Sequence, residues 1–328
     1  MMDQHILQIK NLRVSFNKNK QKTTAVNDVS LQIERGQTVA LIGESGSGKS
    51  ITSLSVLQLL PSNGQVEKGS ITFDGNELLK KPEKEMREIR GNEISMIFQD
   101  AIASLNPGMK VGLQITEGLK YHKLVSKEEL KSEALQLLEQ VGFKNPAQIY
   151  NQYPDQLSGG MKQRILIAMA ISCKPKLLIA DEPTTALDVT IQRQVLDLIE
   201  HYKTDLDASV LLITHDFGVV AEYADWVYVM LGGHIVESAD VYTIFKNPVH
   251  PYTKALIGSI PNPENGQERL KSIQDYTFED TGYDGRKFAP ATYTYESSSF
   301  DAPSSLIEVE PMHYVRFYDD ERKVVAIG

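Results

Sequence analysis

The chain has 328 residues, of which 41% are hydrophobic and 23% are charged, and these proportions are typical of a globular protein. Its length allows one large domain or two ordinary ones. Against 43 Asp and Glu residues there are 34 Lys and Arg residues, so the formal net charge is −9. This balance argues against non-specific binding to duplex nucleic acid, although it leaves room for a local basic patch.

Cysteine content and hydropathy indicate which cellular compartment suits the protein and whether the chain can span a membrane. Cys173 is the only cysteine, so a disulfide within the chain is excluded, which suits a reducing compartment. Residues 1–16 mix charge with short apolar runs and contain no signal-peptide core. No stretch approaches the roughly 20 apolar residues of a membrane-spanning helix. If the protein works at a membrane, we expect another molecule to hold it there.

The first hundred residues carry strand patterns around one helix. Apolar and polar residues alternate at 6–16 and 25–33, which predicts strands. The apolar run at 38–43 predicts a buried strand that ends at a glycine, and residues 49–60 predict a helix that stops before Pro61. Further strands are predicted at 69–75 and 93–100.

Residues 107–153 have a helical pattern. Ser126 and Glu129 form a capping-box pattern, and Gly142 is a helix stop signal. Between them, one helical face carries Leu130, Ala134, Leu137, Leu138 and Val141. A strand, helix and strand rhythm then returns at 176–183, 190–202, 209–216 and 225–237, which indicates a mostly parallel sheet. We therefore expect an α/β core with a helical insertion. Residues 247–266 are rich in turn signals, and the tail to Gly328 predicts a small appended module of uncertain fold.

Two stretches have the layout of an anion site. GESGSGKS at 43–50 follows an apolar strand, opens a helix and fits the phosphate-loop pattern. Its glycines let backbone N–H groups surround phosphate oxygens, the Lys49 ammonium neutralises them and the Ser50 hydroxyl ligates Mg²⁺. QLSGGMKQRI at 156–165 is a second short glycine turn at the start of a helix. The pattern alone does not explain why one chain carries both.

Several polar side chains stand at predicted strand ends. Asp181 is placed to hold Mg²⁺ through water, and Glu182 to activate the attacking water. His215 is placed to contact the γ-phosphate, and Gln99 stands in the same way at the end of another strand. Taken singly, each also fits a plain structural or solvated role. Phe16 fits either an adenine platform or a core position.

The order of the motifs is more specific than any one of them. GESGSGKS is followed by FQD, LSGGMKQR, LLIADEP, TALD and LITHD. In this order the chain resembles the ATP-binding subunit of an ABC transporter, over about residues 6–260. The resemblance implies an ABC-type P-loop nucleotide-binding domain at 1–245, with a mostly parallel core sheet, an antiparallel β subdomain and a helical subdomain at about 104–160. A C-terminal extension at 246–328 follows.

The resemblance also assigns residues. It implies that Glu182, His215 and Gln99 are catalytic, and that Mg²⁺ is held by Ser50, Gln99 and Asp181, partly through water. It assigns ATP binding to Phe16, Gly43, Glu44, Ser45, Gly46, Ser47, Gly48, Lys49, Ser50, Ile51, Gln99 and Asp181.

In this family two nucleotide-binding domains pack head to tail, which explains the second glycine turn. The signature residues, here Leu157, Ser158, Gly159, Gly160 and Met161, would meet the ATP bound to the partner. The D-loop residues, here Ala186, Leu187 and Asp188, would lie along the dimer seam. ATP then joins the dimer and hydrolysis releases it.

Longer phrases narrow the resemblance to the oligopeptide, dipeptide and nickel importer subfamily. They include FQDAIASLNP, ADEPTTALDVT and NPVHPYTKALIGSIP, whose HPYT at 250–253 is interpreted as a turn. Members often carry a cysteine-ligated iron–sulfur cluster in the tail. Here Arg286, Thr292, the serines at 297–299 and Phe317 stand in place of the cysteines, so we expect no cluster and a tail held by packing. Cys173 is expected to be buried.

The resemblance implies ATP and Mg²⁺ as cofactors and a peripheral position on the cytoplasmic face of the cell membrane. Its implied partners are a second, non-identical ABC ATPase, two transmembrane permease subunits and an extracytoplasmic substrate-binding protein, with no nucleic acid. Oligopeptides or dipeptides are the expected cargo, with nickel or a metallophore as the alternative. A soluble ABC ATPase of DNA repair or translation and a non-hydrolysing regulatory module are the rival classes. Intact Lys49, Asp181 and Glu182 conflict with the last of these.

Overall fold

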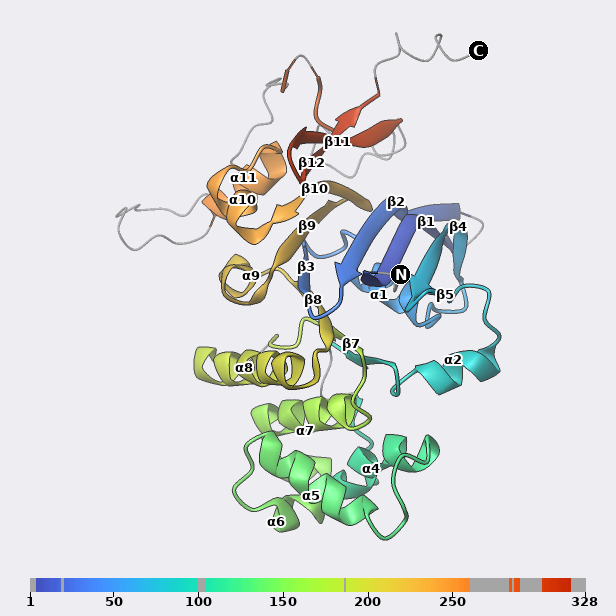
Figure 1. The fold of residues 1–328 in the computed structure, drawn as a ribbon, viewed down its shortest axis with the longest axis vertical. Coiled ribbons are helices and arrows are strands. Elements are labelled where there is room, and N and C mark those ends of the chain that lie inside the picture. Colours follow the sequence, from blue (N-terminus) through green and yellow to red (C-terminus); the bar gives the residue numbers. More distant parts are fainter. Residues whose placement is uncertain are drawn as a thin grey trace.

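The centre of the fold is a sheet with the strand order β11-β12-β10-β9-β3-β8-β7-β6 (Figure 1). The computed structural model describes residues 4–18, 21–99, 104–185, 187–259, 283–284, 286–289 and 303–319. The strands are, in chain order, β3 (Thr38–Ile42), β6 (Ile94–Ile97), β7 (Leu177–Asp181), β8 (Ser209–Thr214), β9 (Trp226–Leu231), β10 (His234–Asp240), β11 (Ser304–Glu310) and β12 (His313–Tyr318). From β9 to β6 neighbouring strands pair in parallel, which confirms the expected parallel core.

Burial explains why the central strands are continuous apolar runs. Every residue of β3, β7 and β8 is buried, because layers of structure cover both faces of a parallel sheet. A second, antiparallel sheet has the order β2-β1-β4-β5. Its strands are β1 (His5–Lys18), β2 (Gln21–Glu34), β4 (Gly64–Phe73) and β5 (Asn76–Glu77). Its inward side chains share a core with β3, β7 and β8. The antiparallel β subdomain expected from the resemblance is therefore present.

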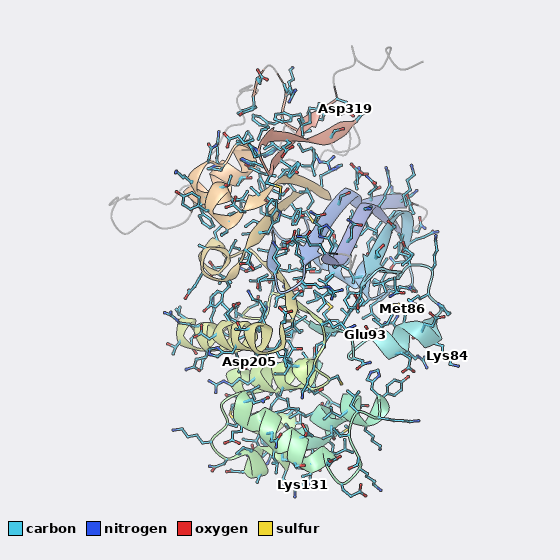
Figure 2. The ribbon with its side chains drawn as sticks, viewed as in Figure 1. Lys84, Met86, Glu93, Lys131, Asp205 and Asp319 are labelled. Carbon is cyan, nitrogen blue, oxygen red and sulfur yellow. The ribbon has the colours of Figure 1, made fainter. Side chains whose placement is uncertain are left out.

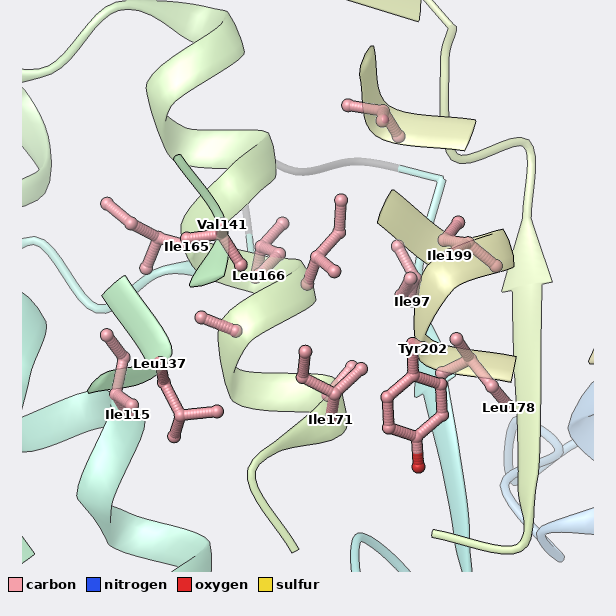
Figure 3. Packing of buried hydrophobic residues seen from close by; sticks show 14 of the residues in the cluster. Ile97, Ile115, Leu137, Val141, Ile165, Leu166, Ile171, Leu178, Ile199 and Tyr202 are labelled. Carbon is pink, nitrogen blue, oxygen red and sulfur yellow. The ribbon is translucent and has the colours of Figure 1, made fainter. Parts of the chain in front are cut away.

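The helical region packs on the other side of the core. Its helices are α4 (Val111–Tyr121), α5 (Leu130–Gln140), α6 (Pro146–Tyr150), the 3₁₀ turn η1 (Pro154–Gln156) and α7 (Gly159–Ile171). The second half of α7, residues 165–171, is apolar all round because it is packed from both sides. Figure 3 shows Ile171 of α7 between Leu137 of α5 and Tyr202 of α8 (Val189–Leu206). Cys173 lies in the same core and is buried, as expected.

The remaining helices lie around the sheets. They are α1 (Lys49–Val56), α2 (Glu83–Ile89), α9 (Phe217–Tyr223), α10 (Val241–Lys246) and α11 (Pro251–Gly258). The helical region and the C-terminal hairpin lie at opposite ends of the long axis, near Lys131 and Asp319 respectively (Figure 2). Across the described parts of the chain, none of the helices is both long and apolar enough to cross a membrane.

The described part of the tail is not separate from the core. Strands β11 and β12 form an antiparallel hairpin, and β12 pairs with β10, so the hairpin extends the central sheet. Phe317 stacks on Phe288 with ring centroids 5.2 Å apart, and Arg286 lies over the Phe317 ring at 5.9 Å. Two of the positions that replace the family's cysteines therefore contribute to an apolar and cation–π cluster. Thr292 and the serines at 297–299 lie outside the described residues.

Three local predictions are corrected. The helix predicted at 49–60 ends at Val56, because Gln58 takes a left-handed conformation with φ of 51° and the Leu59 N–H returns to the Leu54 carbonyl. Only half of the capping box forms: the Ser126 N–H donates to the Glu129 carboxylate, and α5 begins after it.

The turn predicted at 250–253 is instead the start of α11. Pro251 takes the first helical position, where its missing N–H costs nothing.

Candidate functional site

The loop at 43–50 joins β3 to α1 and is shaped by glycines that no other residue can replace. Gly48 has φ of 109°, and a Cβ there would lie 2.6 Å from the Ala25 carbonyl oxygen. A Cβ on Gly43 would lie 2.1 Å from the Met230 carbonyl oxygen. Ser47 is fully buried beneath the loop, whereas Ser45 and Gly46 are exposed at its tip. The loop therefore curls tightly with its outer turn open to solvent.

Lys49 places a cation inside this curl. Its Nζ donates to the carbonyl oxygens of Gly43 at 2.7 Å and Glu44 at 2.8 Å, and its side chain is buried. Burial lowers the pKa of Lys49, while the nearby carboxylates of Glu182 and Asp181 oppose that shift. An ammonium fixed among backbone dipoles suits a phosphate group.

Asp181 ends β7 and faces the start of α1. Burial raises the pKa of its carboxyl group, against a hydrogen bond from the Ser50 side chain. Its Oδ1 is buried and has no hydrogen-bond partner among the described residues. A buried acceptor without a donor is costly in an otherwise paired interior, and it is the kind of oxygen that a hard divalent cation takes as a ligand. Ser50 and Asp181 therefore fit Mg²⁺.

Glu182 is the meeting point of three segments. Its Oε2 accepts hydrogen bonds from Gln99 Nε2 at 2.8 Å and Thr185 Oγ1 at 2.9 Å. His215 Nδ1 lies 3.6 Å from Oε1, and the imidazole is largely exposed. Gln99 follows β6, Glu182 follows β7 and His215 follows β8, so parallel strands deliver all three at their carboxyl ends. The residues that the sequence assigns to catalysis are thus brought together beside Lys49 and Asp181.

The backbone of Glu182 is held in an unusual conformation. Its φ is 46°, in the left-handed region that non-glycine residues seldom adopt, and its N–H donates to the Ile213 carbonyl at 2.9 Å. Residues in such conformations gather at functional sites, where the surrounding structure offsets the strain.

The signature turn lies on a different surface. Ser158 caps α7, with its Oγ accepting from the Met161 N–H at 3.4 Å, and a Cβ on Gly159 would meet no heavy atom within 4 Å. Asp188 caps α8 by accepting from the Ile191 N–H at 3.0 Å. Both caps border a hollow of about 600 Å³ lined by Gly142, Phe143, Lys144, Ser158, Gly159, Gly160, Met161, Arg164, Leu187, Asp188 and Ile191. Among the described residues, none that lines it belongs to the loop at 43–50.

The other predicted residues have plainer surroundings. Phe16 is half-buried on β1 and its ring packs against Gly64. Ile51 packs against the core beneath the antiparallel sheet. Leu157 is buried in the core of the helical region. Ala186 lies outside the described residues.

Sequence reasoning missed three side chains around the site. They are Thr185, Gln163 of α7, whose Nε2 donates to the Pro183 carbonyl at 2.6 Å, and Tyr252 of α11, whose hydroxyl accepts from the Glu44 N–H at 2.9 Å. Thr185 stands in the ADEPTTALDVT phrase, three residues after Glu182, so the sequence could have indicated it. Gln163 and Tyr252 also stand in quoted phrases, but nothing in those phrases indicates that their partners are Pro183 and Glu44.

The phosphate loop, the paired acids at the end of β7 and the capped glycine turn define the chain as a P-loop nucleotide-binding domain. Family models agree: one for ABC transporters matches residues 26–185, and one for the oligopeptide/dipeptide transporter C-terminal region matches residues 236–291. The chain belongs to the ABC transporter ATP-binding proteins and is an ATPase, since curated relatives match almost throughout.

Three relatives illustrate the match. The chain is 46% identical to the oligopeptide transport ATP-binding protein OppD of Bacillus subtilis, over 95% of this chain and 88% of the relative. It is 51% identical to AppD of the same organism, over 82% of each chain. It is 43% identical to the dipeptide transport ATP-binding protein DppD of Lactococcus lactis, over 96% of this chain and 91% of the relative.

The fold also matches a solved structure, the dimeric post-hydrolysis state of the ATP-binding cassette MJ0796 bound to ADP and phosphate. The TM-score is 0.65 at 25% identity, over 72% of this chain and 98% of that one.

Proposed function

We propose that this chain is the ATP-hydrolysing subunit of an importer that carries oligopeptides or dipeptides across the cytoplasmic membrane. The observation that carries the proposal is the convergence of Gln99, Glu182 and His215 beside Lys49 and Asp181. The cargo follows from the relatives, which are named for oligopeptide and dipeptide transport, and from the match of residues 236–291 to the C-terminal region of such transporters.

Each residue of the site has a proposed part in phosphoryl transfer. The N–H groups of the loop at 43–50 and the Lys49 ammonium hold the β- and γ-phosphates. Ser50, Asp181 and Gln99 would hold Mg²⁺, partly through water, and the bound ion supplies charge neutralisation at the phosphates. Glu182 orients the attacking water and accepts its proton, while Gln99 and Thr185 fix the carboxylate by donating to Oε2. His215 is exposed enough to meet the γ-phosphate.

The signature turn is proposed to act on the ATP of a partner ATPase. Its residues at 158–161 and the D-loop residues Leu187 and Asp188 border a hollow whose described lining includes no residue of the chain's own phosphate loop. Open space around Gly159 would allow close approach of a phosphate. We propose that the partner is a non-identical ABC ATPase and that the two pack head to tail around two nucleotides.

The division of labour along the chain is proposed from the same layout. Residues 1–245 would form the nucleotide-binding domain, with the helical region at about 104–160 meeting two permease subunits at the cytoplasmic face of the membrane. An extracytoplasmic binding protein would deliver the cargo, and nucleic acid has no part.

Residues 246–328 would form an extension without an iron–sulfur cluster. Packing supports this, since Phe317 is fully buried among aromatic rings and Arg286 lies against it. Stoichiometric iron in the pure protein would overturn this part of the proposal.

The experiment that tests the function is an affinity pull-down of tagged Glu182→Gln protein with ATP and Mg²⁺. It starts from detergent-solubilised membranes of the native host and ends with mass spectrometry. Two multi-spanning proteins and a second ATPase would support the importer. Recovery of soluble repair or ribosomal proteins alone would overturn it while leaving the family intact.

A further inference from the structure

Tyr252 lies where the end of the ABC core meets the phosphate loop. It stands on α11 and is fully buried, and its hydroxyl accepts a hydrogen bond from the Glu44 N–H at 2.9 Å. On the other side of the same residue, the Glu44 carbonyl accepts from Lys49 Nζ at 2.8 Å. Tyr252 therefore fixes the backbone orientation of a residue that in turn helps to fix the phosphate-binding lysine.

A buried carboxylate holds the chain just before α11. Glu237 of β10 is fully buried, and its Oε1 accepts from the Val249 N–H at 2.7 Å while Oε2 accepts from the His250 N–H at 3.0 Å. His313 of β12 is also fully buried, with Nε2 lying 2.8 Å from Oε1. A carboxylate removed from water needs such partners. The Glu237 carboxylate therefore holds the Val249 and His250 N–H groups and His313 in this arrangement. It ties the residues just before α11 to both β10 and the C-terminal hairpin.

His250 completes the connection to Tyr252. It caps α11, with Nδ1 accepting from the Tyr252 N–H at 3.1 Å. Burial lowers the pKa of His250 to about 4, so the imidazole is neutral at physiological pH and Nδ1 is able to accept. The start of α11, and with it the direction of the Tyr252 ring, is set by buried polar contacts.

We propose that Tyr252 is a positioning residue of the ATP site, and that His313 of the C-terminal hairpin, through Glu237, holds the helix from which Tyr252 acts. The hydroxyl keeps the phosphate loop in its nucleotide-binding shape before ATP arrives. Removing the hydroxyl leaves the Glu44 N–H without its acceptor. Part of the binding free energy of ATP is then used to restore the shape of the loop, so ATP binds more weakly. The extension thereby contributes to nucleotide affinity through the shape of the loop, without a direct contact of Tyr252 or His313 with the phosphates.

The test compares two tyrosines that each lose one buried hydroxyl. Tyr252→Phe removes the acceptor of the Glu44 N–H. Tyr202→Phe is the matched control, because the Tyr202 hydroxyl is also buried and donates to the Pro175 carbonyl at 2.6 Å, away from the loop. We expect Tyr252→Phe to raise the Kd for a fluorescent ATP analogue about tenfold. Both variants should lower Tm by similar amounts, because each loses one buried hydrogen bond. Tyr202→Phe should leave the Kd for the ATP analogue unchanged. An unchanged Kd in Tyr252→Phe would overturn the proposal.

A double-mutant cycle tests the part played by the hairpin. His313→Leu should weaken nucleotide binding in the parent chain but add little in a Tyr252→Phe background, because both changes act through the same helix. His313→Asn, which is too short to reach Glu237, gives the same comparison if His313→Leu does not fold. Independent effects on Kd, or no effect of either His313 variant, would overturn the role of the hairpin and leave only the tyrosine.

Discussion

Replacing Glu182 by Gln is the sharpest test of the catalytic cluster, because the change is small and its surroundings are defined. Glu182 receives hydrogen bonds from Gln99 and Thr185 at a single oxygen, Oε2. The amide oxygen of a glutamine can take the place of Oε2 and keep both bonds, so the loop conformation and Tm should stay close to the parent values. Only the negative charge and the basic lone pair are lost.

The magnitude follows from the role assigned to that lone pair. Loss of a positioned general base lowers kcat by about 10²–10⁴-fold, which corresponds to about 3–5 kcal/mol of transition-state stabilisation. The Kd for ATP should not rise, since Lys49 and the loop amides are untouched. Phosphate release, measured with the partner ATPase present, gives kcat, and a fluorescent nucleotide gives Kd.

A matched surface change separates chemistry from the loss of charge in general. Glu222→Gln removes a carboxylate that pairs with Arg193 at 3.2 Å, where both side chains are more than half exposed. It should leave kcat at the parent value. A Glu182→Gln rate as close to the parent as that of Glu222→Gln would refute the assignment of Glu182 as the residue that activates water.

Three further substitutions probe the nucleotide pocket. Lys49→Ala removes the buried ammonium and should weaken ATP binding by about 100-fold or more, abolishing turnover in the phosphate-release assay; parent-like binding would contradict the site. Gly48→Ala should lower Tm and prevent ATP binding, because the new Cβ meets the Ala25 carbonyl at 2.6 Å with φ at 109°. Asp181→Asn should raise the Tm of the nucleotide-free protein while impairing Mg²⁺-dependent ATPase activity. Burial raises the pKa of Asp181 above its unfolded value, so the ionised carboxylate destabilises the fold as pH rises through that pKa, and a neutral amide does not. An unchanged or lower Tm would contradict this.

Local chemistry in the sequence accounts for the shape of the phosphate loop. The residues of the loop at 43–50 are consecutive, and their conformation depends on glycines whose effect is local. The resemblance assigned Gln99, Glu182 and His215 to catalysis, and the structure brings them together because parallel strands end at one edge of the sheet. The positive φ of Glu182 had no signal, since nothing in LLIADEP distinguishes it from an ordinary strand end.

Long-range contacts account for what was missed. The hydroxyl of Tyr252 meets a loop 208 residues earlier in the chain, and no periodic pattern encodes such a pairing. The hairpin also pairs with a strand that is distant in sequence, since Glu237 of β10 lies opposite Val315 of β12, and for this reason the tail was interpreted as a separate module. The early end of α1 was missed because the left-handed turn falls on Gln58, where a glycine would have given the signal.

The pairing of β12 with β10 also bears on solubility. Without the hairpin, β10 would be the last strand of the central sheet, and it would offer a row of unpaired N–H and C=O groups beside residues that are now almost all buried. Among the described strands, the hairpin moves the edge of the sheet to β11, where exposed Ser305, Glu308 and Glu310 discourage another strand from adding. A chain truncated before β11 should therefore self-associate through β10. One role of the hairpin is thus to prevent edge-to-edge association of two copies of the ATPase.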